Sequence, residues 1–385
     1  MANHLWRWEV HGTVVSLRRA KVTDIERERQ GAQFVAVKLS DGPARAVCYP
    51  NLTGACAVGD ELLLNTTAVE LGLGTGGYHF VVANLSRPER ASSGPGHTMK
   101  LRYTPMQVRV ATAAECEGPP QGELRLPHLL VVVLPLHSTL PAAAVAFAET
   151  APGAPLSYLM TDGAALPIAF SDTVAELREK GLIGRAVTCG HAFGGDVEAV
   201  GLYDGLACAA EAASGGAVLV APGPGLVGTG TRLGTTALEQ GQVVNAVASL
   251  GGRSVVAPRL SLADARSRHR GLSHHTVTAL TVAALVPTTV ALPTMPPELM
   301  AEVREALLGP RADGRPGLTE EHLQVVDASR TREWLKARGL WPKTMGRTPD
   351  DDPLFFEAAG AAGMVAGSVA RPAGPRLPAC GLGRP

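Results

Sequence analysis

Apolar and polar positions alternate in short bursts along the first hundred residues. This period of two is typical of antiparallel strands with one buried face. It occurs in the segments 11–17, 32–41, 44–49, 60–71 and 77–85. Glycine-containing turns separate them, including Asp41-Gly42. The pattern predicts a small all-β domain, a barrel or a sandwich, over residues 1–100, in which 86–100 has the Pro, Gly and Ser bias of a linker or long loop.

An oligonucleotide-binding barrel is one form that this domain could take. Such barrels use exposed aromatic platforms and a basic groove. Both are hard to find in residues 1–100. Binding of nucleic acid is therefore not expected.

The period changes from about residue 127. Apolar runs of strand length alternate with helix-length segments, which is the pattern of βαβ units and a mainly parallel sheet. Six strands are expected, in the segments 128–136, 154–160, 185–190, 216–222, 253–258 and 288–293. The sequence predicts a Rossmann-like α/β domain over residues 101–295, with helices on both faces of the sheet.

Helical periodicity continues beyond residue 295, in the segments 296–309, 329–339 and 352–367. A short strand at 323–328 lies between the first two. We expect residues 296–368 to form a C-terminal helical extension that packs on the α/β domain. Residues 369–385 are expected to be a disordered tail.

Composition and charge narrow the functional class. Of 385 residues, 45% are hydrophobic, and Lys plus Arg equal Asp plus Glu at 35 each. This balance lacks the basic footprint of a dedicated nucleic-acid or membrane-surface binder. The six cysteines contain no CxxC pair, so neither a disulfide framework nor a zinc knuckle is indicated. Residues 1–12 lack an apolar signal core and no apolar run has bilayer length, so a cytoplasmic protein without a membrane partner is expected.

Polar side chains follow the predicted parallel strands. Ligands bind outside the carboxyl ends of such strands, because loops and helix N-termini converge there. His137 follows the first strand, Asp162 the second, and His191 and Asp196 the third. A small-molecule site is therefore predicted at this edge of the sheet. Its candidate acid–base residues are His137, Asp162, His191, Asp196, His269 and His274.

A glycine-rich loop follows the fourth strand and precedes a helix. Its GxGxxG spacing, at residues 223–228, lets backbone N–H groups approach a phosphate. Pro224 interrupts the turn, and Arg259 stands where a dinucleotide site has an acidic residue. A phosphate or another anion therefore fits better than a dinucleotide, and a purely structural turn stays open. The residues expected to hold the anion are Gly223, Gly225, Gly228, Thr229, Gly230, Thr231, Arg259 and Arg268.

The most polar stretch, residues 259–276, contains four arginines, three histidines and an aspartate. Ser273 is placed to cap a helix whose first turn contains His274 and His275. A positive helix end disfavours protonated imidazoles, so both should be neutral. Adjacent helical positions point about 100° apart, so one of the two is expected to lie away from the site. The alternative for this stretch is a solvated charged surface.

Two other chemistries stay open at this edge. No HExxH-like spacing supports a metal site, and the sequence names no cofactor. Cys189 could be a nucleophile, although a buried structural cysteine is commoner. The ligands available to a metal ion are His137, Asp162, His191, Asp196 and one of His274 or His275.

Five short motifs carry a resemblance to a known family. They are LHS at 136–138, TDGAALP at 161–167, GPGLVGTGT at 223–231, ADARSRHRGLSHHT at 263–276 and MGR at 345–347. The chain resembles a family of bacterial proteins catalogued as a domain of unknown function, up to about residue 368. The resemblance implies one architecture for the family and carries no reaction, cofactor or catalytic residue.

The leading hypothesis is an enzyme that acts on a small anionic molecule, phosphate-bearing or nucleotide-like, by His/Asp acid–base chemistry, as a hydrolase or transferase. The alternative is a non-catalytic ligand-sensing or assembly protein that uses the same cleft. The chain could form a homo-oligomer. A catalytic site should place a histidine and a carboxylate within about 3 Å of each other, whereas a sensor needs only donors and shape.

Overall fold

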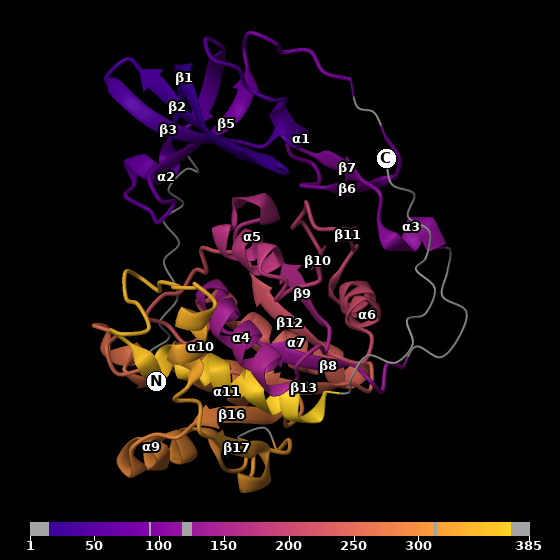
Figure 1. Cartoon of the computed structure of the whole chain (residues 1–385), viewed down its shortest axis with the longest axis vertical. Helices are drawn as coiled ribbons and strands as arrows, with labels where there is room; N and C mark the ends of the chain where they lie inside the picture. Colours follow the sequence, from indigo (N-terminus) through magenta and orange to yellow (C-terminus); the bar gives the residue numbers. More distant parts are fainter. Residues whose placement is uncertain (1–14, 92–93, 118–124, 312–313, 371–385) are drawn as a thin grey trace, which may run out of the picture. The chain divides into compact units, whose positions relative to one another are not determined.

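The computed structural model describes residues 15–91, 94–117, 125–311 and 314–370 (Figure 1). The chain divides into two compact units, residues 1–93 and 94–385. Residues 94–100, predicted to belong to the first domain, are therefore part of the second unit.

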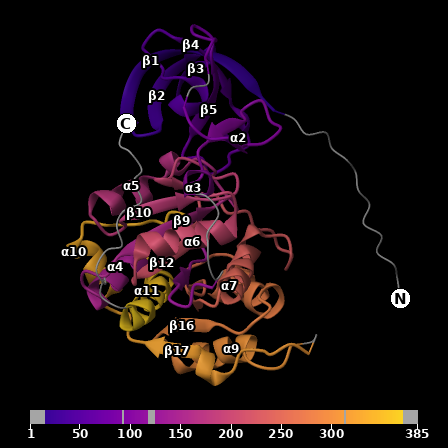
Figure 2. The same cartoon turned by 90° about the vertical axis from the view of Figure 1, so that its right-hand side faces the viewer.

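The first unit is a closed five-stranded barrel, as the alternating pattern predicts. Its strands pair in the order β1-β2-β3-β5-β4 (Figures 1 and 2). They are β1 (Leu17–Arg29), β2 (Ala32–Leu39), β3 (Gly42–Cys48), β4 (Glu61–Asn65) and β5 (Tyr78–Asn84), with two short helices, α1 (Pro50–Thr53) and α2 (Thr67–Glu70). Apolar side chains at alternate positions, such as Val35, Val37, Leu62 and Leu64, fill its interior.

The strand order, with β3 parallel to β5, is that of the oligonucleotide-binding barrel considered above. The architecture depends on the core, whereas nucleic-acid binding depends on exposed aromatic and basic side chains. Phe34, which lies outside the core cluster, is 2% exposed, and the guanidinium groups of Arg27 and Arg29 lie 4.0 and 5.0 Å from its ring centroid. The barrel alone therefore carries no functional assignment.

The second unit is built on an eight-stranded parallel sheet in the order β11-β10-β9-β12-β8-β13-β16-β17. The strands are β8 (Leu130–Val133), β9 (Leu156–Thr161), β10 (Arg185–Thr188), β11 (Val197–Glu198), β12 (Ala217–Pro222), β13 (Arg253–Val256), β16 (Thr289–Pro293) and β17 (Leu323–Val326). All six strands expected from the apolar runs are present. The short strand expected in the C-terminal extension is β17, which forms one edge of the sheet.

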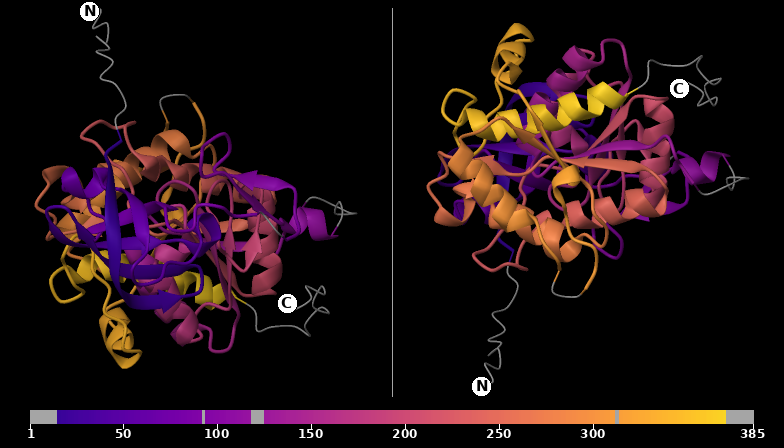
Figure 3. Two further views of the ribbon diagram at one scale, coloured as in Figure 1. Left: turned by 90° about the horizontal axis from the view of Figure 1, so that it is seen from above. Right: turned by 90° about the horizontal axis from the view of Figure 1, so that it is seen from below.

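Helices cover both faces of this sheet (Figure 3). One face carries α4 (Leu140–Thr150), α5 (Asp172–Glu179), α10 (Thr331–Ala337) and α11 (Pro353–Val369). The other carries α6 (Leu202–Ala213), α7 (Glu239–Ser249), α8 (His274–Thr278) with a π-helical continuation at Ala279–Ala283, and α9 (Pro297–Leu307). The chain runs from β8 toward β10 and then returns across the sheet toward β17. Because parallel crossovers are right-handed, the two directions place helices on opposite faces.

A buried lysine attaches the start of the second unit to the sheet. Here β6 (Thr98–Lys100) pairs with β7 (Val108–Val110), and α3 (Ala113–Glu117) follows. Lys100 is fully buried, and its Nζ lies 2.6 Å from Glu198 Oε2 and 3.1 Å from the Thr188 carbonyl oxygen. This ion pair explains why residues 94–100 belong to the second unit.

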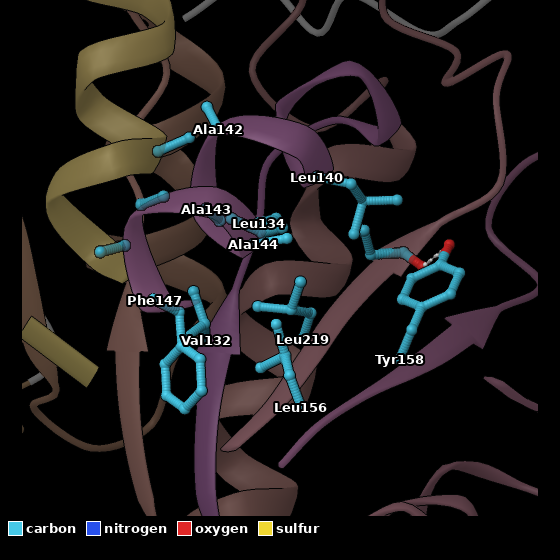
Figure 4. Packing of buried hydrophobic residues seen from close by; sticks show 14 of the residues in the cluster. Val132, Leu134, Leu140, Ala142, Ala143, Ala144, Phe147, Leu156, Tyr158 and Leu219 are labelled. Atoms are coloured by element: carbon cyan, nitrogen blue, oxygen red, sulfur yellow. Dashed lines mark hydrogen bonds between the residues drawn. The ribbon is translucent and has the colours of Figure 1, made fainter. Parts of the chain in front are cut away.

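The C-terminal extension is continuous with the second unit. Figure 4 shows Ala142, Ala143 and Phe147 of α4 beside α11, in yellow. A Cβ atom at Gly363 of α11 would lie 2.2 Å from the Ala143 carbonyl oxygen. The small residues of α11 therefore let two helix backbones approach closely. The predicted tail lies, from residue 371 onward, outside the described residues.

No helix among the described residues combines the length and the apolar character needed to cross a membrane.

Replacing Gly363 with Ala tests this helix contact. The added methyl group meets backbone that cannot rotate away, so we expect a net loss of about 1–3 kcal/mol of unfolding free energy, despite the higher helix propensity of alanine. Urea denaturation measures it. Ser368→Ala, at an exposed position of the same helix, should change stability by less than about 0.5 kcal/mol. A Gly363→Ala variant as stable as wild type would contradict the close packing.

Candidate functional site

The polar stretch at 259–276 forms a hairpin that leads into a helix. Strand β14 (Leu260–Ser261) pairs with β15 (Gly271–Leu272), and the Ser273 N–H donates to the Arg259 carbonyl oxygen at 2.9 Å. Ser273 Oγ then caps α8 by accepting the His275 N–H at 3.3 Å, as the sequence predicts. The hairpin and the first turn of α8 are thereby held together.

A buried carboxylate organises this hairpin. Asp264, 2% exposed, accepts a bidentate pair of hydrogen bonds from Arg266, with Nε at 3.0 Å and Nη2 at 2.9 Å. Arg259 Nη2 lies 3.1 Å from the same carboxylate, and Arg347, from a distant part of the chain, lies 3.4 Å away. Arg347 also pairs with buried Asp352 at 3.0 Å. Burial alone would raise the pKa of Asp264, but the hydrogen bonds of Arg266 and the charges of Arg266 and Arg259 hold it well below its usual value.

Three histidines meet beside this ion-pair network. His269, His274 and His275, hereafter the histidine cluster, have ring centroids 4.4 to 5.3 Å apart. One ligand atom from each lies within 4.8 Å of the others. The expectation that one of His274 and His275 points away is wrong, because His269 approaches the first turn of α8 closely enough to contact both rings.

The histidine cluster is neutral at pH 7. Burial, followed by neighbouring cationic groups, lowers the pKa of all three rings, to about 3 for His269 and about 4 for His275. Arg259 contributes at each ring, and Arg268 contributes at His274 and His275. The two arginines therefore lie close enough to act electrostatically on the cluster.

Several buried polar atoms around the histidine cluster lack a hydrogen-bond partner among the described residues. They are Arg259 Nε, Arg268 Nε, His274 Nε2 and His275 Nε2. Buried polar groups are nearly always paired in folded proteins, and an unpaired one costs about 1–3 kcal/mol. This concentration of unpaired atoms is the strongest sign of a ligand site in the described structure.

The glycine-rich loop packs against protein rather than cradling an anion. A Cβ atom at Gly223 would lie 2.3 Å from the Ala165 carbonyl oxygen, and one at Gly228 would lie 2.4 Å from His275 Cε1. Gly225 has a φ of 99°, which favours glycine, and Gly230 faces open space. The glycine at 228 therefore allows the loop to lie directly on the histidine cluster.

Two backbone amides of the glycine-rich loop donate hydrogen bonds within the loop. The Thr229 N–H donates to the Gly234 carbonyl oxygen at 2.9 Å, and the Thr231 N–H donates to Thr229 Oγ1 at 3.2 Å. An anion cradle needs free N–H groups. The Thr229 and Thr231 amides are therefore not free for an anion, whereas Arg259 and Arg268 keep unpaired donors. An anion at the other amides of the loop stays a prediction.

His137 has protein partners at both ring nitrogens. Nδ1 lies 3.1 Å from the Pro222 carbonyl oxygen, and Nε2 lies 2.6 Å from Ser171 Oγ. Because a carbonyl can only accept, Nδ1 carries the proton and Ser171 donates to Nε2. Burial lowers the pKa of His137 to about 4. This neutral ring ties the ends of β8 and β12 to the start of α5.

The remaining predicted acid–base residues form separate contacts. Asp162 accepts the backbone N–H of His191 at 2.9 Å, and His191 Nδ1 accepts the Leu101 N–H at 3.0 Å. Asp196 pairs with Arg178 on α5. Among the described residues, no hydrogen bond or ion pair joins these groups to the histidine cluster. The six predicted acid–base residues are thus divided among several polar groups rather than gathered in one.

A second polar group surrounds a cavity at the ends of β8, β9 and β12. The cavity holds about 10 Å³, room for about one water molecule. Thr161, Glu239 and Gln240 line it, and Gln240 Oε1 has no hydrogen-bond partner in the described chain. Burial raises the pKa of Glu239 to about 7; the Thr161 hydroxyl opposes this shift and Asp162 adds to it. A carboxyl group that titrates near neutrality suits proton exchange.

Sequence reasoning missed the roles of Asp264, Glu239 and Arg347. Asp264 lies inside the polar stretch 259–276. The two arginines that flank it could have identified it as the partner of an ion pair. Glu239 is the first residue of α7, directly after the glycine loop and the 3₁₀ turn at Thr236–Leu238, so extending the strand-end search to the next helix finds it. Arg347 lies 83 positions from Asp264; the MGR motif at 345–347 contains it, but no spacing connects it with Asp264.

The chain therefore combines a closed five-stranded barrel with a parallel α/β unit. The chain belongs to the family described as protein of unknown function (DUF3866), whose model matches residues 45–363. The resemblance carried by the five motifs is thereby confirmed. No curated protein and no solved structure matches the chain significantly.

The environment of Glu239 predicts a pH-dependent stability. Its pKa in the folded protein, about 7, lies above the ordinary value of 4.5, so the folded state binds more protons than the unfolded state between these values. Stability is therefore lost as the pH rises through this window. Glu239→Gln removes that loss. The difference in unfolding free energy between the variant and wild type should therefore favour the variant more at pH 8.5 than at pH 5, by up to about 3 kcal/mol.

Urea denaturation of wild type and Glu239→Gln at the two pH values measures this difference. Glu298→Gln, at an exposed position in the first turn of α9, is the matched control and should show little pH dependence. An equal effect of Glu239→Gln at pH 5 and pH 8.5 would contradict the buried, protonatable carboxyl.

Proposed function

We propose that the protein is an enzyme that binds a small anionic molecule, phosphate-bearing or nucleotide-like, beside Arg259, Arg268 and the histidine cluster. One observation carries the proposal: two buried guanidinium Nε–H groups, on Arg259 and Arg268, have no acceptor in the described chain. A guanidinium group donates only and keeps its charge at neutral pH. The missing partner is therefore an acceptor, and an anionic oxygen is the strongest one.

The local charge supports an anion. Asp264 and Asp352 supply two negative charges, while Arg259, Arg266 and Arg347 supply three positive ones. Arg268 adds a further positive charge close to His274 and His275. An anionic ligand balances this excess in a partly buried site, where charges are weakly screened.

Acid–base chemistry is assigned to Glu239 in this proposal. No histidine side chain contacts a carboxylate among the described residues, so the His/Asp pair expected from the sequence lacks support. Glu239 is half-buried and its pKa is raised to about 7. Thr235, four positions earlier, lies 3.5 Å from His275 Nδ1. The segment from Thr235 to Glu239 thus contacts the histidine cluster at one end and carries the protonatable carboxyl at the other, and we assign it to a hydrolase or transferase.

The proposed location is the cytoplasm. Cys48, Cys56 and Cys189 are buried thiols that form no disulfide in the described structure. Buried thiols that are not paired fit a reducing compartment.

Arg268→Ala tests the anion site. Loss of the unpaired guanidinium should weaken binding of inorganic phosphate at least tenfold, about 1.4 kcal/mol, because it removes a charge-assisted donor without touching the Asp264 network. Isothermal titration calorimetry in a buffer of low ionic strength measures it. Arg270→Ala removes an exposed arginine two positions away and should leave the affinity nearly unchanged.

Two results would contradict the proposal. One is a wild-type protein that binds neither phosphate nor any of a panel of nucleotides and sugar phosphates. The other is an equal loss in Arg268→Ala and Arg270→Ala, which would mean general charge attraction. Turnover of a bound phosphate ester that Glu239→Gln abolishes would support an enzyme, and binding without turnover would favour the ligand-sensing alternative.

A further inference from the structure

We propose that His269, His274 and His275 form a binding site for one divalent transition-metal ion of the zinc class. Their ligand atoms lie within 4.8 Å of one another. Zinc–nitrogen bonds are about 2.0–2.1 Å long, so small rotations of the three rings bring the nitrogens to one ion. This inference rests on the proposed function only for the identity of a fourth ligand, which would be the bound anion.

Hydrogen bonding favours a proton on His275 Nδ1, the nitrogen that lies beside Thr235. The Thr235 hydroxyl donates to the Val227 carbonyl oxygen at 3.0 Å and accepts the Ala237 N–H at 3.1 Å. Since its proton is committed, Thr235 Oγ1 acts as the acceptor for His275 Nδ1, at 3.5 Å. In this tautomer His275 Nε2 is an acceptor. It has no hydrogen-bond partner in the described chain, although only 3% of the residue is exposed.

His269 is oriented in a similar way. Its Nδ1 lies 2.7 Å from Ser273 Oγ, the residue that caps α8. A metal-binding histidine characteristically donates its other ring N–H to a neighbouring oxygen, which fixes both tautomer and ring orientation. Ser273 and Thr235 thus supply the outer contacts that a metal ligand needs, from two different segments of the chain.

The ligand set selects the class of metal. Three neutral imidazoles suit zinc and related transition ions, whereas magnesium and calcium prefer oxygen ligands. Three protein ligands leave a fourth position open, as in catalytic zinc sites. Arg259 and Arg268 oppose a bare cation, and an anion on the open position offsets that repulsion. Metal and anion should therefore bind with positive coupling.

Zinc binding by the full-length protein tests the proposal. The zinc content is measured by elemental analysis after gel filtration in phosphate-free buffer, and the affinity by competition with a chromophoric chelator. We expect one zinc ion per chain. The affinity should fall at least tenfold in His274→Ala and in His275→Ala. His128→Ala, which removes an exposed histidine, should bind zinc as wild type does.

Thermal melts establish that the histidine variants are folded. If His275→Ala unfolds, His274→Ala still tests the metal site, because His274 is only half-buried. Wild type without stoichiometric zinc, or equal losses in His128→Ala and His274→Ala, would overturn the metal site. Added phosphate should tighten zinc binding, and an unchanged zinc affinity would overturn the coupling. If the protein binds zinc but not phosphate, only the proposed anion function is contradicted. If it binds phosphate in the presence of a chelator and does not bind zinc, only the metal site is contradicted.

Discussion

The candidate site depends on one buried carboxylate. Asp264 is 2% exposed and contacts the guanidinium groups of Arg259, Arg266 and Arg347. Removing one partner from a buried ion pair leaves uncompensated charge, which is far costlier than the loss of a surface pair. The carboxylate joins the hairpin at 259–273 to a C-terminal segment, and it holds Arg259 beside the histidine cluster.

Buried hydrogen-bond donors and acceptors that lack partners lie together around the histidine cluster. The Nε–H groups of Arg259 and Arg268 can be satisfied by an anionic oxygen. The His275 Nε2 lone pair can be satisfied by a cation or a hydrogen-bond donor. Buried polar groups in folded proteins are nearly always paired, so unpaired donors and an unpaired acceptor beside one another favour a bound ligand. The glycine at 228 brings a loop onto the His275 ring, so the site is built from three segments that follow β12, β13 and the hairpin.

Much of this architecture follows from local patterns. Apolar runs identify strands such as β8 and β12 because both faces of the parallel sheet are covered, and alternation identifies the barrel because only one face of each strand is buried. The same reasoning identified the edge of the sheet and the stretch 259–276 as the place of a candidate site. The roles of individual residues were not found in this way. His137, for example, follows a strand in sequence, yet its two ring nitrogens contact Ser171 and Pro222. Arg347 contacts Asp264 through tertiary packing, which no spacing within the sequence reveals.

The unfolding free energy of Asp264→Asn tests the central claim, that this carboxylate holds the site together. Asparagine keeps the shape but not the charge, and it leaves Arg259 buried without its counter-ion. Urea denaturation at pH 7 should show a loss of about 3–5 kcal/mol. Asp350→Asn, at an exposed aspartate paired with Arg332, should lose no more than about 0.5–1 kcal/mol. A change in Asp264→Asn as small as that of Asp350→Asn would contradict the account.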